Sequence, residues 1–210
     1  MDIVKNWAGQ NKIAITDAQL ILLQKHQQMV LEKNKVMNLT AITDPSEFAV
    51  KHIIDSLALL PYVPYKTHLA DIGTGAGFPG IVLAIMRKDV HVTLVDALRK
   101  RVIFLQEAVQ QLGLTNVECI HARAEDLARK GQIFDICTAR AVARMDKLAK
   151  WVLPITKKGG LFLAMKGPET QEELDAAKLA IAKQGGRVKS VNLVEIAEGI
   201  KHSIVIVEKV

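Results

Sequence analysis

Cysteine is scarce in this chain of 210 residues, which contains only Cys119 and Cys137. The two cysteines do not show the spacing of a metal site, and both fall in apolar, strand-like runs. We therefore expect no bound metal, and we expect both thiols to be small core residues in a reducing compartment.

Segments that would direct the chain to a membrane or out of the cell are also missing. No apolar run reaches the roughly 20 residues that span a bilayer. Met1 to Trp7 lacks the pattern of a signal peptide. The chain has no internal repeat and no low-complexity segment. These absences predict a cytoplasmic protein that does not contact a membrane.

The composition instead suits one folded domain with a basic surface. Hydrophobic residues make up 50% of the chain, which is enough for the full core of one domain and leaves room for a small extension. Lys and Arg number 28 against 22 Asp and Glu, so the net charge is +6. This excess favours a polyanionic partner such as a nucleic acid, although many basic proteins bind none.

One glycine-rich stretch organises the rest of the sequence. Residues 67–72 predict a buried strand, residues 73–80 read Gly-Thr-Gly-Ala-Gly-Phe-Pro-Gly, and residues 81–86 predict an apolar helix. Glycines let the backbone approach a ligand closely, and a helix start offers unpaired N–H groups. Strand, turn and helix together predict a site for a nucleotide-type cofactor.

The glycine spacing separates this turn from two phosphate-binding motifs. Gly73, Gly75 and Gly77 follow Gly-x-Gly-x-Gly rather than the Gly-x-Gly-x-x-Gly of dinucleotide sites, and no Lys-Ser or Lys-Thr follows as in a P-loop. Asp71, just before the turn, suits a ligand with an ammonium group, and S-adenosylmethionine has one. The alternative is a structural turn closed by Asp71. We favour the cofactor because a second acid stands at the expected place.

That second acid is Asp96, at the end of the apolar run His91 to Val95. It lies about 20 residues past the glycines, where nucleotide-binding α/β folds carry an acid that accepts the two ribose hydroxyls. The alternative is an N-cap for the next helix, and both roles can hold together.

Strands and helices alternate after residue 66. This predicts an α/β fold with a mostly parallel sheet, a terminal antiparallel hairpin and a helical N-terminal cap. We expect residues 1–66 to be a helical extension packed on a main domain over 67–210. The expected strands are 67–72, 91–95, 116–120, 134–138, 161–165, 188–196 and 202–207, and the expected helices begin at Thr16, Asp44, Ile81, Leu98 and Glu169, the last ending at Gln184.

The candidate ligand contacts gather at the carboxyl ends of the predicted strands. Ligands of parallel sheets bind beyond these ends. Gly73, Asp96, Ala124-Glu125 and Arg140 each lie just past their own strand. We therefore expect them to converge on one crevice.

Three polar residues, His52, Asp55 and Ser56, follow the helix start at Asp44. They do not predict a catalytic triad, because all three lie within about one turn of one helix and the chain has no nucleophile elbow. We interpret them as a polar strip on a helix that lies across the cofactor site.

Four segments make the sequence resemble the glucose-inhibited division protein B family. The resemblance covers nearly the whole chain, and its four marks together are specific where the glycine turn alone would be weak. They are Val36-Met37-Asn38-Leu39-Thr40, Lys51-His52-Ile53-Ile54-Asp55-Ser56, residues 71–80, and Thr138-Ala139-Arg140-Ala141-Val142-Ala143.

The resemblance implies a Rossmann-like class I methyltransferase that uses S-adenosylmethionine. It implies methylation at N7 of a guanosine in the decoding-region loop of 16S rRNA; naked RNA, an assembly intermediate and the finished 30S subunit all stay open as the substrate. We expect a monomer with no obligate protein partner. The resemblance also implies residue roles: Gly73 and Phe78 contact the cofactor, Gly75 and Gly77 shape the same loop, Asp96 holds the ribose, Ala124 and Glu125 meet the adenine, and Arg140 closes the site near the methionine end or the target base.

The sequence lacks residues that methylation at other base atoms would need, and methylation at N7 does not need them. Guanine N7 carries a lone pair, so it needs positioning rather than a general base. Pyrimidine C5 methylation would want a cysteine in a loop, but Cys137 lies in a strand. Adenine amino methylation would want an Asn-Pro-Pro-Tyr-like loop after the fourth strand, where Ala139-Arg140-Ala141 stands. Arg140 can face phosphate or the O6 and N7 edge of guanine.

Two other functions remain open from the residues. One is a non-catalytic RNA-binding or ribosome-assembly protein that retains the cofactor fold, and the other is a methyltransferase for small molecules. The acids at 71, 96 and 125 argue against the first, and basic residues beside the strand ends argue against the second. The expected RNA contacts are Arg99, Lys100, Arg101, Arg123, Arg144 and Lys166, each of which could also be ordinary solvated charge.

Overall fold

The computed structural model describes residues 1–168 and 170–210 as an α/β fold built on one seven-stranded sheet. The sheet order is β3-β2-β1-β4-β5-β7-β6, and β7 runs antiparallel to both of its neighbours. This confirms the predicted mostly parallel sheet with a terminal hairpin. The strands are β1 (His68–Ile72), β2 (His91–Asp96), β3 (Val117–His121), β4 (Phe134–Arg140), β5 (Thr156–Lys166), β6 (Gly186–Ala197) and β7 (Ile200–Lys209).

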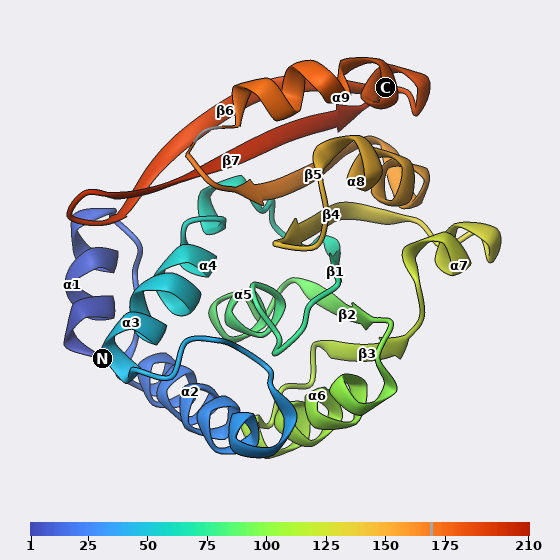
Figure 1. The fold of residues 1–210 in the computed structure, drawn as a ribbon. Helices are drawn as coiled ribbons and strands as arrows, with labels where there is room; N and C mark the ends of the chain where they lie inside the picture. The colour runs from blue at the N-terminus through green and yellow to red at the C-terminus, as the bar shows by residue number, and fades with distance from the viewer. Residues whose placement is uncertain (169) are drawn as a thin grey trace.

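Helices cover both faces of the sheet (Figure 1). One apolar cluster joins the N-terminal helices, α5 and α6 to one face, and a second joins α7, α8 and α9 to the other. The α-helices are α1 (Asp2–Gln10), α2 (Asp17–Met37), α3 (Pro45–Phe48), α4 (Asp55–Leu57), α5 (Gly80–Met86), α6 (Arg99–Leu112), α7 (Ala124–Arg129), α8 (Met145–Val152) and α9 (Gln171–Lys183). Glu169, the expected first residue of the last helix, lies outside the described residues.

The segment before β1 is helical as predicted, and its local signals explain why. Thr16 and Gln19 form the predicted capping box at the start of α2. Asp44 accepts hydrogen bonds from the backbone of Ser46 and Glu47 at the start of α3. A π-helical turn, Ala49–Ile54, then connects α3 to α4. None of the helices in the described ranges is both long and apolar enough to cross a membrane.

The N-terminal helices and the sheet share one core. Val4, Leu23 and Phe48 are fully buried in the same cluster as Ile81 and Leu94 of the α/β part. Helix α1 is also tied to the hairpin, because the indole of Trp7 donates to the carbonyl of Glu195, 3.0 Å away. The expected domain boundary at residue 66 stays a prediction.

Candidate active site

The buried side chain of Asp71 stabilises the glycine turn between β1 and α5 through hydrogen bonds. One carboxylate oxygen of Asp71 accepts hydrogen bonds from the backbone N–H of Gly80 at 2.8 Å and from the hydroxyl of Thr74 at 2.6 Å. Its other oxygen has no partner among the described residues. Burial raises the pKa of Asp71 to about 6, and the two hydrogen bonds limit the rise. Asp71 therefore fastens the loop and the start of α5.

Asp96, at the end of β2, holds the same turn from its other side. Its carboxylate accepts the N–H of Gly75 at 3.0 Å and the N–H of Leu98 at 2.8 Å. Leu98 is the N-cap of α6, so Asp96 does not cap that helix itself. The side chain is buried, with Arg101 3.6 Å away. Each Asp96 oxygen still has a lone pair with which it can accept a further hydroxyl.

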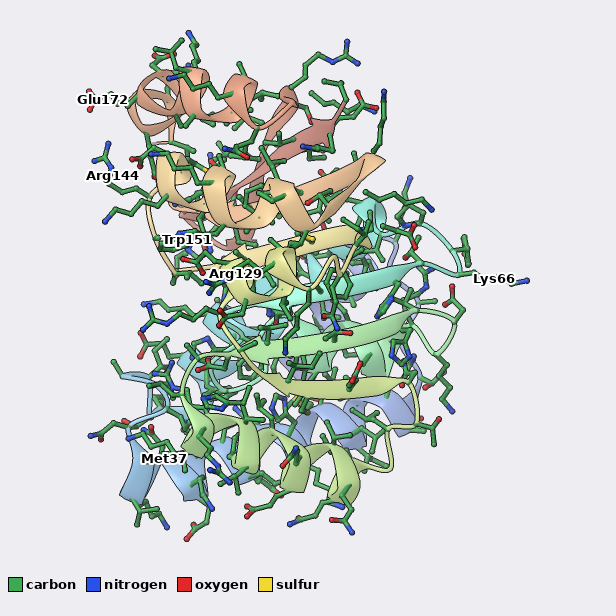
Figure 2. All side chains as sticks on the ribbon, turned by 90° about the vertical axis from the view of Figure 1, so that its right-hand side faces the viewer. Met37, Lys66, Arg129, Arg144, Trp151 and Glu172 are labelled. Atoms are coloured by element: carbon green, nitrogen blue, oxygen red, sulfur yellow. The ribbon has the colours of Figure 1, made fainter. Side chains whose placement is uncertain are left out.

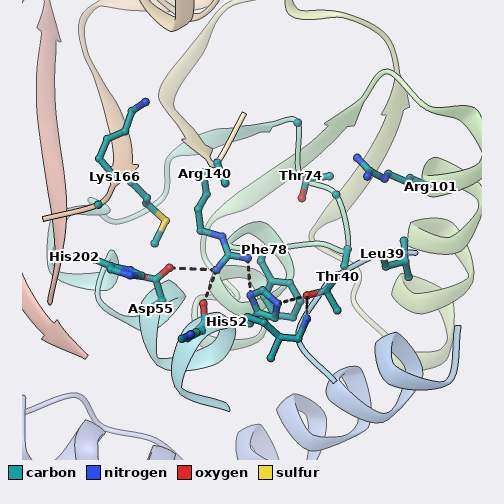
Figure 3. Close-up of a pocket in the computed structure, with 18 residues that line it drawn as sticks. Leu39, Thr40, His52, Asp55, Thr74, Phe78, Arg101, Arg140, Lys166 and His202 are labelled. Carbon is teal, nitrogen blue, oxygen red and sulfur yellow. Dashed lines mark hydrogen bonds and ion pairs between the residues drawn. The ribbon is translucent and has the colours of Figure 1, made fainter. Parts of the chain in front are cut away.

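A cavity of about 470 Å³ opens beside the turn, beyond the carboxyl ends of β1 and β4. Figure 3 shows its walls, which come from segments far apart in the sequence. Leu39 and Ile42 belong to the loop after α2, Arg140 ends β4, and His202 comes from β7. The remaining lining residues are Thr40, Lys51, His52, Asp55, Gly73, Thr74, Gly75, Ala76, Phe78, Arg101, Ala141, Met165, Lys166 and Gly167.

A second cavity, of about 180 Å³, meets the first at Gly73. Its walls combine Val95, Val142 and Trp151 with the expected adenine contacts Ala124 and Glu125. Gly73 has a φ of +67°, and a Cβ there would lie 2.7 Å from a methyl group of Val142. Only glycine fits at this junction, because a side chain would be strained and would collide with Val142.

Arg140 is the most constrained polar group of the larger cavity. Its guanidinium donates to the carbonyl of Lys51 at 2.8 Å, to Asp55 at 3.2 Å and to the Nδ1 atom of His52 at 2.9 Å. It also lies near the ring of Phe78, with 5.4 Å from its central carbon to the ring centroid. These contacts fix the plane of the guanidinium (Figure 3).

Two histidines, the buried His26 and the partly buried His52, enclose Phe78 of the glycine turn. The ring centroids of His26 and His52 lie 4.7 Å and 4.9 Å from that of Phe78, and both pairs are stacked. Burial lowers the pKa of His26 to about 4, and burial together with Arg140 lowers that of His52 to about 3. Both rings are therefore neutral at pH 7. Because arginine can only donate, Nδ1 of His52 is bare and its Nε2–H donates to Thr40, 2.8 Å away.

The structure brings most of the expected cofactor contacts to the two cavities. Gly73, Gly75, Phe78 and Arg140 line the larger one, and Ala124 and Glu125 the smaller one. The other expected contacts, Asp71, Gly77 and Asp96, are buried behind the turn and line neither cavity. A Cβ at Gly77 would meet Ile81 at 2.5 Å, so this glycine serves packing inside the loop.

Only part of the polar strip expected on the helix after Asp44 faces the larger cavity. His52 and Asp55 line the larger cavity, as expected. Ser56 is fully buried and donates its hydroxyl to the carbonyl of His52, so it does not face the cavity.

Most of the expected RNA-contacting cations are exposed, but Lys166 differs from the rest. Its ammonium donates to the carbonyl of Ala143 at 2.6 Å and to Glu173 at 2.7 Å, and its side chain is only 12% exposed. Glu173 also accepts the N–H of Met145. Lys166 therefore holds the loop after β4, and its contact with RNA stays a prediction. Arg144, which is exposed, lies on the opposite edge of the molecule from Lys66 (Figure 2).

Sequence reasoning missed five residues that line the cavities or support their walls. His26 gave no local signal, because its partner Ala76 is 50 positions away in the chain. Thr40 and Val142 fall inside segments that carry the family resemblance but had no assigned role. Trp151 lies in an amphipathic helix and His202 in a strand, where neither stands out by spacing.

Comparison with known proteins decides the family. A profile of the family described as rRNA small subunit methyltransferase G (GidB) matches residues 19–204. The chain belongs to this family. It is 47% identical over 192 residues to the ribosomal RNA small subunit methyltransferase G of Clostridium perfringens strain 13, covering 88% of this chain and 80% of the relative. The corresponding protein of Desulfitobacterium hafniense Y51 is 45% identical over 201 residues, with 94% and 84% covered.

Solved structures show that the chain shares its fold with other methyltransferases. The structure of M. jannaschii TYW2 in complex with AdoMet matches with a TM-score of 0.59 at 18% identity, over 76% of each chain. TrmN of Thermus thermophilus matches with a TM-score of 0.58 at 19% identity, over 74% of this chain and 48% of that one. The protein is therefore an enzyme, an S-adenosylmethionine-dependent methyltransferase with the predicted Rossmann-like fold.

Proposed function

We propose that the enzyme transfers a methyl group to N7 of a guanosine in the decoding-region loop of 16S rRNA. The relatives' names support ribosomal RNA of the small subunit as the substrate. The observation that carries the choice of atom is the larger cavity, where a fixed Arg140 stands beside the glycine turn and no reactive thiol is present among the lining residues.

The two cavities suit the two ends of S-adenosylmethionine. The smaller one, with Ala124, Glu125 and Trp151, would hold the adenine, and the larger one would hold the amino-acid end beside Gly75 and Phe78. Gly73, at their junction, gives the ligand room to pass from one to the other. Asp96 would accept the ribose hydroxyls in addition to the two N–H groups that it already accepts. When bound, the cofactor supplies an electrophilic methyl group on a sulfonium sulfur.

The protein's own groups are suited to positioning rather than to proton removal or covalent attack. Burial raises the pKa of the Cys137 thiol to about 12, and this residue is fully inside the sheet. His26 and His52 are neutral and engaged in hydrogen bonds. N7 of guanine needs only alignment with the methyl group. Arg140 would orient the base from its fixed position.

An RNA with 7-deazaguanosine at the target position tests the choice of atom. This base keeps the shape and pairing edge of guanine but lacks the N7 lone pair. We expect the deaza RNA to bind as the unmodified RNA does and to accept no methyl group, while the unmodified RNA gains one. Methyl transfer to the deaza RNA would show that another atom is the acceptor.

The exposed cations beside the strand ends support an RNA-facing surface. Arg99, Lys100, Arg123 and Arg144 follow β2, β3 and β4 and are exposed. We propose that a monomer applies this surface to 16S rRNA within a 30S subunit or an assembly intermediate, which would place the enzyme in the cytoplasm. Incubation with labelled cofactor and either naked rRNA or 30S particles distinguishes these substrates.

A further inference from the structure

A short loop after β4, residues 141–144, crosses the junction between the two cavities. Ala141 lines the larger cavity and Val142 the smaller one, although they are neighbours in the chain, and Gly73 lines both. The two methyl groups of Val142 lie 2.7 Å and 3.2 Å from the position that a Cβ at Gly73 would occupy. Val142 therefore fills the space that the glycine leaves at the junction. We call this loop the strap.

The strap is anchored on either side of the junction. Before it, the guanidinium of Arg140 is fixed by three acceptors of the helical segment before β1. After it, Lys166 donates to the carbonyl of Ala143, and Glu173 accepts both from Lys166 and from the N–H of Met145. The two ends of the strap therefore stay in place if its middle moves.

Between these anchors the strap is weakly held. Ala141 has a φ of +54°, in the left-handed region that residues other than glycine rarely adopt. Neither Ala141 nor Val142 takes part in a backbone hydrogen bond within residues 1–168 and 170–210. Val142 is also 37% exposed, so its contact with Gly73 covers only part of the side chain. A segment with so few contacts opens at a low cost in free energy.

We propose that Val142 is a gate for the cofactor, which fills the junction in the free enzyme and leaves Gly73, by a movement of the strap, before S-adenosylmethionine can occupy both cavities. This inference rests on the proposed function, through the placement of the cofactor across the two cavities, and is independent of the methylated atom. The free enzyme is then mostly closed. The association rate and the apparent affinity are both reduced by the fraction of molecules that is open.

A fixed wall is the alternative role for Val142. As a wall, its methyl groups would contact the bound cofactor and slow its release. The two roles predict opposite changes of affinity for Val142→Ala. Removing a gate raises the open fraction, so the cofactor binds faster and more tightly. Removing a wall loses contacts in the complex, so the cofactor leaves faster and binds more weakly.

Calorimetry and stopped-flow fluorescence with S-adenosylmethionine separate the two roles, with Trp151 in the smaller cavity as the reporter. Val142→Ala should raise the association rate constant and lower Kd, each by roughly 5- to 10-fold, and leave the dissociation rate constant within twofold of wild type. Val142→Leu fills the junction further and should slow association by about threefold or more. Val188→Ala, at a valine of β6 that is 38% exposed, is the matched control and should bind as wild type.

A variant outside both cavities tests whether the strap itself moves. Glu173 lines neither cavity, and Glu173→Ala removes the acceptor of both Lys166 and Met145. Loosening this anchor should raise the association rate constant by roughly two- to threefold and lower Kd by the same factor. Urea titrations of each variant establish that it is folded under the binding conditions.

Three outcomes overturn the inference. Weaker binding of Val142→Ala at an unchanged association rate means that Val142 is a fixed wall. Unchanged rates and Kd in this variant mean that the junction is not gated, and an unchanged association rate in Glu173→Ala means that the strap does not move. Failure of the cofactor placement is recognised separately with Trp151→Leu in calorimetry. A wild-type Kd in that variant means that the smaller cavity does not hold the adenine, and this inference then fails together with the placement.

Discussion

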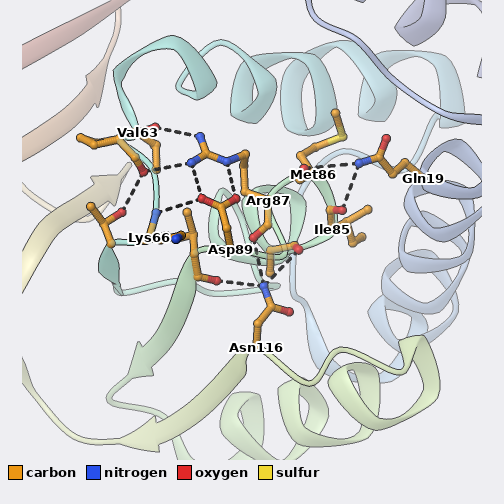
Figure 4. Close-up of polar contacts among 12 residues, drawn as sticks. Gln19, Val63, Lys66, Ile85, Met86, Arg87, Asp89 and Asn116 are labelled. Atoms are coloured by element: carbon orange, nitrogen blue, oxygen red, sulfur yellow. Dashed lines mark hydrogen bonds and ion pairs between the residues drawn. The ribbon is translucent and has the colours of Figure 1, made fainter.

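The two ends of helix α5 are held in different ways. At its C-terminal end, neutral amides donate to the last carbonyls. Gln19 lies 3.4 Å from the carbonyl of Ile85 and 3.3 Å from that of Met86. Asn116 reaches the carbonyl of Ala84 and those of Arg87 and Val90 just past the helix (Figure 4). At its N-terminal end, buried Asp71 and the stacked His26 each leave one polar atom without a partner in the described chain. The last carbonyls at the C-terminal end therefore all have hydrogen-bond donors, whereas the N-terminal end contains buried titratable side chains with unpaired atoms.

This difference separates the end that supports the sheet from the end that binds ligands. Unpaired buried polar atoms cost stability, so they are expected where function requires them. Arginine appears at both ends in a similar fork. Arg87 donates to the carbonyls of Val63 and Pro64 and to Asp89, while Arg140 donates to Lys51, Asp55 and His52. Because Arg87 and Arg140 make similar contacts, the same substitution at each residue tests whether the two ends of α5 differ in function.

Arg140→Lys should have the largest effect on activity. A single ammonium cannot reach the three acceptors of the planar guanidinium at once, so the group that we propose to orient the base would be misplaced. We expect kcat/KM for methyl transfer to fall roughly 100-fold, which is about 2.7 kcal/mol. Arg87→Lys is the matched control: it should lower stability but change methyl transfer less than about threefold. Similar activity losses in both variants would mean that the two ends are not functionally distinct.

Asn116→Ala should be the largest stability change at the supporting end. The side-chain nitrogen lies 2.9–3.3 Å from the carbonyls of Ala84, Arg87 and Val90, and these lose their donor. We expect the free energy of unfolding to fall by about 1–3 kcal/mol in urea titrations, with unchanged cofactor affinity. Asn6→Ala, exposed on α1, provides the control. A large loss of cofactor affinity in Asn116→Ala would mean that the C-terminal end of α5 also contributes to ligand binding.

The titratable groups of the ligand-binding end should give the protein a pH-dependent stability. His26 and His52 have pKa values of about 4 and 3, below the usual 6.5, so the folded state binds fewer protons than the unfolded state between these values. Stability should therefore rise with pH up to about 6.5, by at most about 1.4 kcal/mol per pH unit for each histidine.

Asp71 works in the opposite direction. Its pKa of about 6 lies above the usual 3.8, so its contribution to stability falls as pH rises through that interval. Asp71→Asn should remove this opposing effect and steepen the rise of stability between pH 4 and 6. Urea titrations across this range measure both slopes, and a wild-type stability that is constant from pH 4 to 6.5 would contradict the assignment of His26 and His52 as neutral at pH 7.

The smallest expected effect is on the salt dependence of RNA binding. Cations at the ligand-binding edge displace counterions from phosphates, so affinity should fall steeply with salt. Arg144→Gln should reduce the slope of log affinity against log salt by about 1, whereas Lys66→Gln, at the opposite edge, should leave it unchanged. Equal slopes for both variants and the wild type would remove Arg144 from the RNA-binding surface.

Local interactions account for what the sequence could predict. The capping box of Thr16 and Gln19 and the glycine turn at 73–77 depend on residues only a few positions apart. The mostly parallel sheet with a terminal hairpin followed from the alternation of apolar runs with helices, whereas the order of strands within the sheet was not predicted. The sequence predicted a functional role for Asp71 but not where its side chain points. The strand pattern does not show that the carboxylate accepts the N–H of Gly80 instead of facing a ligand.

Long-range contacts account for most of the rest. Arg140 meets His52 across 88 positions, and His202 meets Asp55 across 147. No periodicity links residues at such separations, so His52 and Asp55 appeared only as a polar strip. Trp151 and Val142 reach the smaller cavity because α8 and the loop before it pack beside β4, which depends on the tertiary fold.

The position of β7 in the sheet has a consequence for biosynthesis. This strand follows every other strand of the sheet in the sequence, yet it lies between β5 and β6 and delivers His202 to Asp55. A nascent chain that has emerged only as far as residue 199 contains the residues of the glycine turn and both of its aspartates. It lacks one wall of the larger cavity, and β5 has an unpaired edge. Translation must therefore pass residue 202 before Asp55 has both of its partners and the larger cavity has its last wall.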